Sequence, residues 1–453
     1  MSAAPARAEC IIQARWIAPV EGPRRLLEDH ALVIRDGRIA DLLPATELAG
    51  RWQAPEHHEL SEHLLIPGLV NAHTHSGMNL FRGLADDLPL EEWLHEHIWP
   101  AEGRWVSESF VTDGTRLAVA EMIRCGVTSF GDMYFYPDCI ARVASEAGIR
   151  AAIFNPVLDF PTPMGQGPDD YLRTAIRCID EWRHHPLITP GFGPHSPYAV
   201  SDEPLGRIAT LAEEMDVPVM IHLHESAGEV QPDERGERPV ARLQRLGLLS
   251  PRLQAVHMVH VTDEEIALVA ETGTHVAHCP ESNLKLANGF CPVERLRAAG
   301  VNVALGTDSV ASNNDLDMIG EMRTAALLAK AVTRDASALS ADEVLAMATL
   351  GGARSLGLEQ HTGSLVAGKH ADIAAIDLGQ LESRPLYDPV AQLVYSAARS
   401  QVTHVWVGGK CLMAEREMRT LNLERLLRSA DAWQQQLEQY SQGHHAPGPE
   451  EAS

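Results

Sequence analysis

The middle of the chain repeats one pattern: a short apolar run, a loop, and then a stretch with amphipathic helical spacing. The apolar runs predict buried strands, and stretches such as 111–124, 172–182 and 319–331 predict helices that bury one face. We count eight such alternations over about 270 residues, the number and size of an α/β protein with a (β/α)8 TIM barrel. The predicted strands end near His75, Met133, Val157, His195, His224, Val259, Cys279 and Asp308.

Both ends of the chain have a different pattern, which is typical of β-strands. Apolar runs at 31–35 and 38–43 flank the turn pair Asp36-Gly37, a strong signal for a β-hairpin. Runs of similar character return at 371–376 and 402–407. We therefore expect a small composite β-sandwich domain built from residues 1–65 and 365–425, with the catalytic barrel at 66–364. A C-terminal helix and a disordered tail from Gly443 are expected within 426–453.

Composition excludes several classes of partner. Lys plus Arg number 37 and Asp plus Glu 62, so the formal net charge is −25. A surface this acidic repels phosphate backbones and anionic lipids, and we expect neither nucleic acid nor membrane as a partner. No signal peptide and no apolar run long enough to span a bilayer are evident, and the seven cysteines are scattered without C-x-x-C spacing. A reduced, cytoplasmic protein is the expectation.

Histidines and carboxylates gather at the predicted strand ends. His73 and His75 close the first strand, and their spacing of two points both imidazoles to one side. His222, His257 and Asp308 close later strands. Because the carboxyl ends of barrel strands meet at one face, this set predicts a metal site with an open position for water. His224 is expected to have a loop role, and the histidines in polar surroundings are expected to be solvated: His57, His58, His63, His95, His97, His184, His185, His444 and His445.

Four segments carry a resemblance to a known family. They are 67–75 (PGLVNAHTH), 191–198 (GFGPHSPY), 278–286 (HCPESNLKL) and 306–314 (GTDSVASNN). The first is similar to the strand-one signature of the amidohydrolase superfamily. The others resemble the branch that holds 5′-methylthioadenosine/S-adenosylhomocysteine deaminases, together with triazine hydrolases and guanine deaminases. The similarity runs from about residue 10 to about residue 425.

The resemblance implies a distorted barrel with one divalent metal ion per chain, Zn²⁺ by preference, and a small-molecule nucleoside as substrate. Its metal ligands would be His73, His75, His222 and Asp308. The remaining roles implied are a proton shuttle at Glu225, a hydrogen bond from His257 to the reacting centre, a ribose contact at Glu102 and a further nucleoside contact at His195. Glu225 and Asp308 would also contact the substrate. The activity implied is zinc-dependent hydrolytic deamination.

One departure from the family pattern bears on the substrate. Asn155 aligns with one carboxylate-binding arginine of the family, and the segment Phe160–Asp170 contains no arginine. An anionic amino-acid tail would lack a guanidinium partner, so 5′-methylthioadenosine is predicted over S-adenosylhomocysteine.

Several alternatives stay open at this point. They are deamination of S-adenosylhomocysteine or adenosine, a triazine- or guanine-type aminohydrolase or chlorohydrolase, and a non-catalytic scaffold that lost its metal. A homo-oligomer is also open.

Overall fold

The barrel is built from one sheet of parallel strands. In this computed structural model, which describes residues 5–21, 26–89 and 92–444, the strands follow the order β14-β13-β12-β11-β10-β9-β8-β7. An isolated parallel bridge between Thr74 and Asp308 brings the two edges of the sheet together. The predicted (β/α)8 fold is therefore confirmed. Its strands are β7 (Leu69–Thr74), β8 (Val127–Asp132), β9 (Arg150–Val157), β10 (Ile188–Pro194), β11 (Val219–Leu223), β12 (Leu253–His257), β13 (His275–His278) and β14 (Val303–Leu305).

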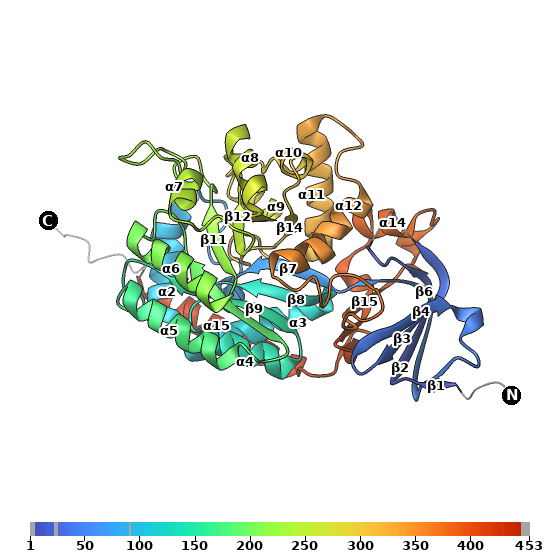
Figure 1. The fold of residues 1–453 in the computed structure, drawn as a ribbon. Coiled ribbons are helices and arrows are strands. Elements are labelled where there is room, and N and C mark those ends of the chain that lie inside the picture. Colours follow the sequence, from blue (N-terminus) through green and yellow to red (C-terminus); the bar gives the residue numbers. More distant parts are fainter. Residues whose placement is uncertain (1–4, 22–25, 90–91, 445–453) are drawn as a thin grey trace.

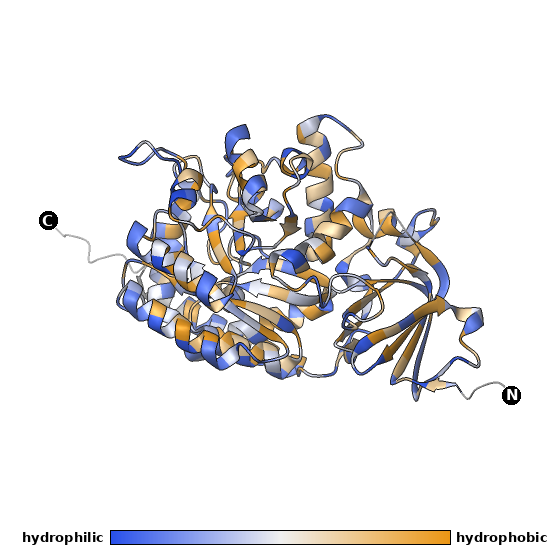
Figure 2. Cartoon of the chain, viewed as in Figure 1, coloured by the Kyte–Doolittle hydropathy of each residue, from blue (hydrophilic) through white to orange (hydrophobic). Residues whose placement is uncertain are grey.

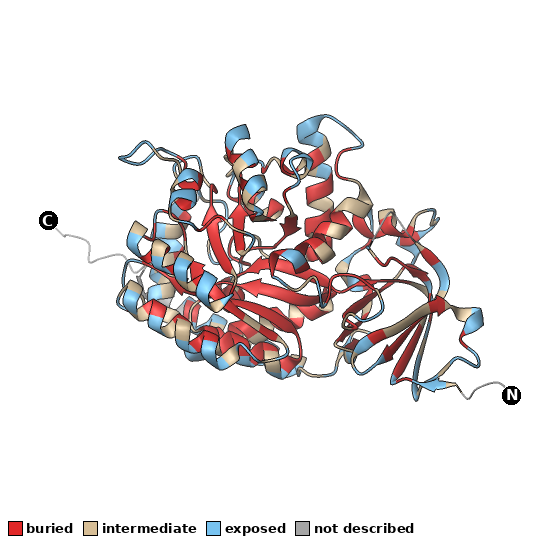
Figure 3. Cartoon of the chain, in the orientation of Figure 1, coloured by how far each residue is buried: buried red, intermediate tan, exposed pale blue. Residues whose placement is uncertain are grey.

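Helices surround the sheet and bury its outer surface, as Figure 1 shows. Because both surfaces of the sheet are covered, most strand residues are buried, which explains their nearly continuous apolar runs (Figures 2 and 3). The helices are α3 (Glu108–Arg124), α4 (Pro137–Ala147), α5 (Pro168–Trp182), α6 (Asp202–Met215), α7 (Pro239–Arg245), α8 (Asp263–Thr272), α9 (Pro280–Lys285), α10 (Val293–Ala298), α11 (Met318–Thr333), α12 (Ala341–Ala346), η4 (Met347–Gly351) and α13 (Gly352–Ser355).

A second sheet, beside the barrel, joins the two ends of the chain. Its order is β18-β17-β16-β15-β6-β2-β3-β4, and the predicted hairpin is present as β3 and β4. Strands from the N-terminal and C-terminal regions meet where β15 pairs with β6 (Figure 1). The strands are β2 (Cys10–Ile17), β3 (Leu27–Arg35), β4 (Arg38–Pro44), β6 (Glu56–Pro67), β15 (Ile373–Asp377), β16 (Val402–Val407), β17 (Lys410–Ala414) and β18 (Glu417–Met418), and a separate pair is β1 (Ala6–Arg7) with β5 (Trp52–Gln53).

A buried ion pair links this β domain to the barrel. The Arg150 guanidinium, at the start of β9, lies 2.6 Å from the Asp372 carboxylate, next to β15. The other Asp372 oxygen accepts a hydrogen bond from the backbone N–H of Gly408. The composite origin of the sheet follows the prediction, whereas the domain boundaries proposed from the sequence stay predictions.

The remaining segments lie over the barrel or at the end of the chain. Between β7 and α3, η2 (Ser76–Phe81), η3 (Trp93–Ile98) and α2 (Trp99–Trp105) form one wall of the barrel opening. The C-terminal helix α15 (Leu423–His444) is tied to α3 by Trp433, which donates to Asp113. The predicted tail from Gly443 is helical at its first two residues, and the rest lies outside the described residues. In the part of the chain that the structure describes, no helix is long and apolar enough to cross a membrane.

Candidate metal centre and active site

Four predicted ligands meet at the carboxyl ends of the barrel strands. The Nε2 atom of His222 lies 3.2 Å from His73 Nε2 and 3.3 Å from His75 Nε2. Asp308 Oδ1 lies 3.3 Å from His73 Nε2 and 3.2 Å from His75 Nε2. A tetrahedron with metal–ligand bonds of about 2.0–2.1 Å has edges of about 3.3–3.4 Å. The four donor atoms are therefore spaced to hold one zinc-sized ion.

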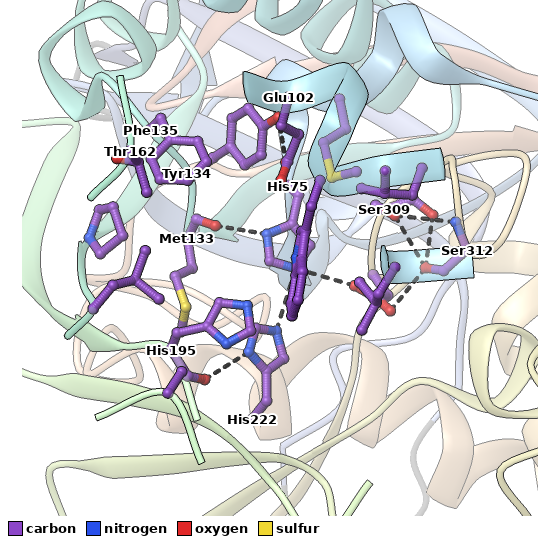
Figure 4. Close-up of a pocket in the computed structure, with 18 of the residues that line it drawn as sticks. His75, Glu102, Met133, Tyr134, Phe135, Thr162, His195, His222, Ser309 and Ser312 are labelled. Carbon is purple, nitrogen blue, oxygen red and sulfur yellow. Dashed lines mark hydrogen bonds and ion pairs between the residues drawn. The ribbon is translucent and has the colours of Figure 1, made fainter. Parts of the chain in front are cut away.

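The second nitrogen of two imidazoles is held by a main-chain carbonyl. His75 Nδ1 lies 2.6 Å from the carbonyl oxygen of Met133, and His222 Nδ1 lies 2.7 Å from that of His195 (Figure 4). An Nδ1–H that donates to a carbonyl leaves the Nε2 lone pair free for a metal. Burial lowers the pKa of His73 to about 4, which keeps that imidazole neutral at pH 7, as a ligand must be.

Asp308 is held by two serines. Its Oδ2 atom accepts hydrogen bonds from Ser282 Oγ at 2.6 Å and from Ser312 Oγ at 2.8 Å, so Oδ1 is left for the ion. Burial alone would raise the pKa of Asp308, but the neighbouring imidazoles of His73 and His75 outweigh it and hold that pKa well below its usual range. The carboxylate is therefore ionised and oriented.

The backbone at the strand ends is unusual. Asp308 has φ 62° and His257 has φ 75°, a left-handed conformation that non-glycine residues adopt only when their surroundings enforce it. Gly306 is also required here, because a Cβ atom on it would lie 2.8 Å from the backbone nitrogen of His73. These positions let β14 approach β7 closely and turn the Asp308 side chain toward the histidines.

Glu225 and His257 lie next to the four-ligand cluster. Glu225 Oε2 is 3.7 Å from His257 Nε2, and its other oxygen accepts from Asn288 Nδ2 at 3.0 Å. The opposite nitrogen of His257 lies 2.9 Å from Asn283 Oδ1, which orients the ring. Burial raises the pKa of Glu225, so its carboxyl can hold a proton nearer to neutral pH than an exposed glutamate can.

A cavity of about 370 Å³ opens from this cluster, large enough for a small organic ligand. Glu102, on α2, lines it and accepts a hydrogen bond from the Tyr134 hydroxyl at 2.7 Å (Figure 4). Burial raises the pKa of Glu102 to about 7. His195 also lines the cavity, with its ring 4.8 Å from that of His222. All the predicted site residues therefore lie at one place.

The cavity wall is mostly apolar. No arginine or lysine belongs to it among the described residues. The segment Phe160–Asp170 contributes Phe160, Pro161, Thr162 and Pro163 to the wall, as a substrate-facing loop would. Asn155, which aligns with a carboxylate-binding arginine of the family, does not line the cavity, because its side chain is buried and donates to the Gly191 carbonyl.

Several supporting residues were not found from the sequence. Ser282, Asn283 and Ser312 lie within the segments that carry the resemblance, but their spacing alone indicated no role. Tyr134 had no signal, since it follows a strand whose end carries no ligand. Glu229 accepts from the backbone N–H groups of His224 and Glu225 and so shapes the loop after β11. His224 lies just after the end of β11, in the loop where it was expected, and it is fully buried near Glu265.

Comparisons with known proteins show which sequences this chain is similar to. The family model "Amidohydrolase family" matches residues 64–412. A 5-methylthioadenosine/S-adenosylhomocysteine deaminase of Saccharophagus degradans is 52% identical over 433 residues, which cover 95% of this chain and 97% of that protein. A protein of the same name from Teredinibacter turnerae is 46% identical, and the match covers 94% of this chain and 97% of that protein.

Solved structures are also similar to this chain. The crystal structure of an adenosine deaminase from Xanthomonas campestris with bound zinc has a TM-score of 0.95 and 46% identity. The match covers 96% of this chain and 100% of the deaminase chain. The structure of atrazine chlorohydrolase from Arthrobacter aurescens has a TM-score of 0.88, with coverage of 94% and 99%. At 24% identity it supports the fold alone.

Proposed function

The chain belongs to the amidohydrolase family, and on that premise we propose that it is a zinc-dependent hydrolytic deaminase of adenine nucleosides. The observation that carries the proposal is the convergence of His73, His75, His222 and Asp308 beside Glu225, at the end of a cavity of nucleoside size. The names of the similar proteins, two of which are methylthioadenosine/S-adenosylhomocysteine deaminases and one an adenosine deaminase, favour an adenine ring as the reacting group.

The reaction replaces the exocyclic amine of adenine with oxygen from water and releases ammonia. His73, His75, His222 and Asp308 would hold a divalent ion, which would lower the pKa of a water to about 7 and so provide the nucleophile. Glu225 protonates the ring nitrogen beside the attacked carbon, takes up the proton that the added hydroxyl loses as the carbonyl forms, and gives that proton to the departing ammonia. Asp308 accepts the proton of the attacking water. His257, oriented by Asn283, donates a hydrogen bond to the oxygen that is added to the attacked carbon, where negative charge develops.

The far part of the cavity would bind the sugar and the 5′ substituent. We assign Glu102 to the ribose hydroxyls, because a carboxylate accepts from two neighbouring hydroxyl groups and Tyr134 holds it in place. His195 is assigned a second nucleoside contact.

The 5′ substituent is the part that separates the candidate substrates. We propose that 5′-methylthioadenosine is preferred over S-adenosylhomocysteine, because an apolar wall suits a methylthio group. An amino-acid carboxylate would find no cationic lining residue among those the structure describes. We also propose that the protein works in the reducing cytoplasm with no nucleic-acid partner, in line with its charge of −25 and its free cysteines.

The test is to measure kcat/KM for methylthioadenosine, S-adenosylhomocysteine and adenosine side by side, with the rate of ammonia release as the readout. We expect a ten- to hundredfold preference for methylthioadenosine over S-adenosylhomocysteine, equivalent to about 1.5–3 kcal/mol for a missing charge partner. Equal values would contradict the substrate preference. If the protein turned over a triazine or guanine but no nucleoside, the proposed substrate class would be wrong. If it bound no metal and had no activity, it would be a non-catalytic scaffold.

A further inference from the structure

A second group of metal-binding side chains lies in the β domain, away from the cavity. Register pairs Cys10 of β2 with Glu56 of β6, and His58 follows Glu56 by two residues. Because side chains alternate along a strand, Glu56 and His58 point to the same face of the sheet. Cys10 belongs to the apolar core on that face. A thiol, a carboxylate and an imidazole therefore converge from two neighbouring strands.

The three donor atoms are close enough to share one ion. One ligand atom each from Cys10, Glu56 and His58 lies within 4.8 Å of the other two. His58 Nε2 is 2.8 Å from Glu56 Oε1. Cys10 is only 2% exposed, whereas the side chains of His58 and Glu56 are 19% and 52% exposed. The group thus has a buried sulfur and an opening to solvent, through which an ion can enter.

A second thiol packs against the same core. Cys411, on β17, lies opposite Trp406 in the sheet register, and it packs against the core that contains Cys10 and Trp406. Burial, Glu56 and Cys411, in that order, raise the pKa of the Cys10 thiol to about 12, so the two sulfurs and the carboxylate interact electrostatically. The Cys10 thiol is therefore protonated at neutral pH, and an ion that binds here must displace its proton. The His404 ring lies 5.5 Å from that of His58.

We propose that Cys10, Glu56 and His58 bind a second divalent cation that prefers sulfur and nitrogen ligands, such as Zn²⁺. Thiolate and imidazole together select borderline and soft metals over Mg²⁺ or Ca²⁺. Binding forms the metal–sulfur bond as the Cys10 thiol releases its proton to solvent. The site ties β2 to β6 and is independent of the deaminase reaction, since none of its residues lines the cavity.

Cobalt provides a probe that separates the two sites. The barrel ligands are three imidazoles and a carboxylate, so a thiolate-to-cobalt charge-transfer band can arise only from the β domain. We expect the full chain, stripped of metal and reloaded with excess Co²⁺ under reducing conditions, to bind two equivalents and to show this band. Absence of the band in a folded, cobalt-saturated wild type would overturn the proposal.

Variants assign the band to its residues. Cys10→Ser should bind one equivalent of Co²⁺ and lose the band. Glu56→Gln and His58→Asn, which change partly exposed side chains, should keep the fold and weaken binding at this site by at least about tenfold. Cys139→Ser is the matched control, because Cys139 is 3% exposed and should leave both equivalents and the band unchanged. A Cys10→Ser or Glu56→Gln protein that keeps the wild-type band and affinity would refute the assignment.

Discussion

The protein carries two groups of histidines and acids, one at the carboxyl ends of the barrel strands and one in the β domain. The barrel group comes from three strand ends far apart in sequence and consists of His73, His75, His222 and Asp308. In His75, His222 and Asp308, the nitrogen or oxygen atom that does not face the ion is hydrogen-bonded to another group of the protein. In the β-domain group, Glu56 and His58 bond to each other and lie partly in solvent. The first arrangement is held in place by the groups around it, whereas the second is partly open to solvent.

This difference accounts for the chemistry assigned to each group. A catalytic ion must be held in fixed geometry next to a proton carrier, and Glu225 lies there, within 3.7 Å of His257. The β-domain group has no such carrier beside a cavity, so an ion there can only stabilise. Substitutions in the barrel group should therefore change catalysis, and those in the β-domain group should change metal content and leave catalysis unchanged.

The largest effect is expected for Asp308→Asn. The amide removes the anionic ligand and the acceptor for the water proton, and a metal contributes several kcal/mol to catalysis, so kcat should fall by about a thousandfold or more. Activity and bound zinc should be measured on the same preparation. Glu56→Gln is the control from the other group and should keep deaminase activity. A fully active Asp308→Asn protein would remove the distinction between the two groups.

Glu225→Gln tests the proton carrier without changing the ligands. General acid–base catalysis contributes about 10²–10⁴-fold, so turnover should fall at least about a hundredfold. Zinc content should stay near that of the wild type, because Glu225 is not among the four converging ligands. A variant with turnover within tenfold of the wild type would assign the proton transfer to another group, with Asp308 the first to examine.

Ser312→Ala tests whether fixed orientation is what separates the barrel group from the β-domain group. The substitution removes one of the two hydroxyls that hold Asp308, and loss of such a partner costs about 10–100-fold in metal affinity or activity. Competition with a chelator measures the affinity. Ser337→Ala, on an exposed loop, serves as the control. An unchanged affinity would mean that the strand-end backbone alone orients the carboxylate.

The smallest effect is expected for Tyr134→Phe. It removes the 2.7 Å hydrogen bond to Glu102 and leaves the ion and Glu225 untouched. A hydrogen bond to a charged group contributes about 1.5–3 kcal/mol, and we expect kcat/KM for methylthioadenosine to fall by about tenfold or somewhat more, chiefly through KM. Steady-state kinetics with adenine-to-hypoxanthine absorbance gives both constants. A loss in kcat alone would assign Tyr134 to the reaction centre.

Much of the barrel site was predictable because strand ends obey simple rules. His73 and His75 are two residues apart, so their side chains point to the same side of the strand. Because the carboxyl ends of parallel strands meet at one face, the pattern of apolar runs also predicts that these histidines lie close to His222 and Asp308. The roles of Glu102 and His195 came from the family resemblance and stay predictions. Ser282, Ser312 and Tyr134 could not be found in this way, since a hydroxyl that holds another side chain has no periodic signal.

The sequence by itself determined the barrel, the composite β domain and the set of strand-end ligands, because hydrophobic periodicity and residue chemistry are local properties of the chain. Only the tertiary structure decided which second-layer groups orient those ligands and that Asn155 does not face the cavity. It also decided that Cys10 lies beside His58, which the sequence indicated to be solvated. Those relations depend on which strands pair and on where the chain turns back, and a linear pattern does not carry that information.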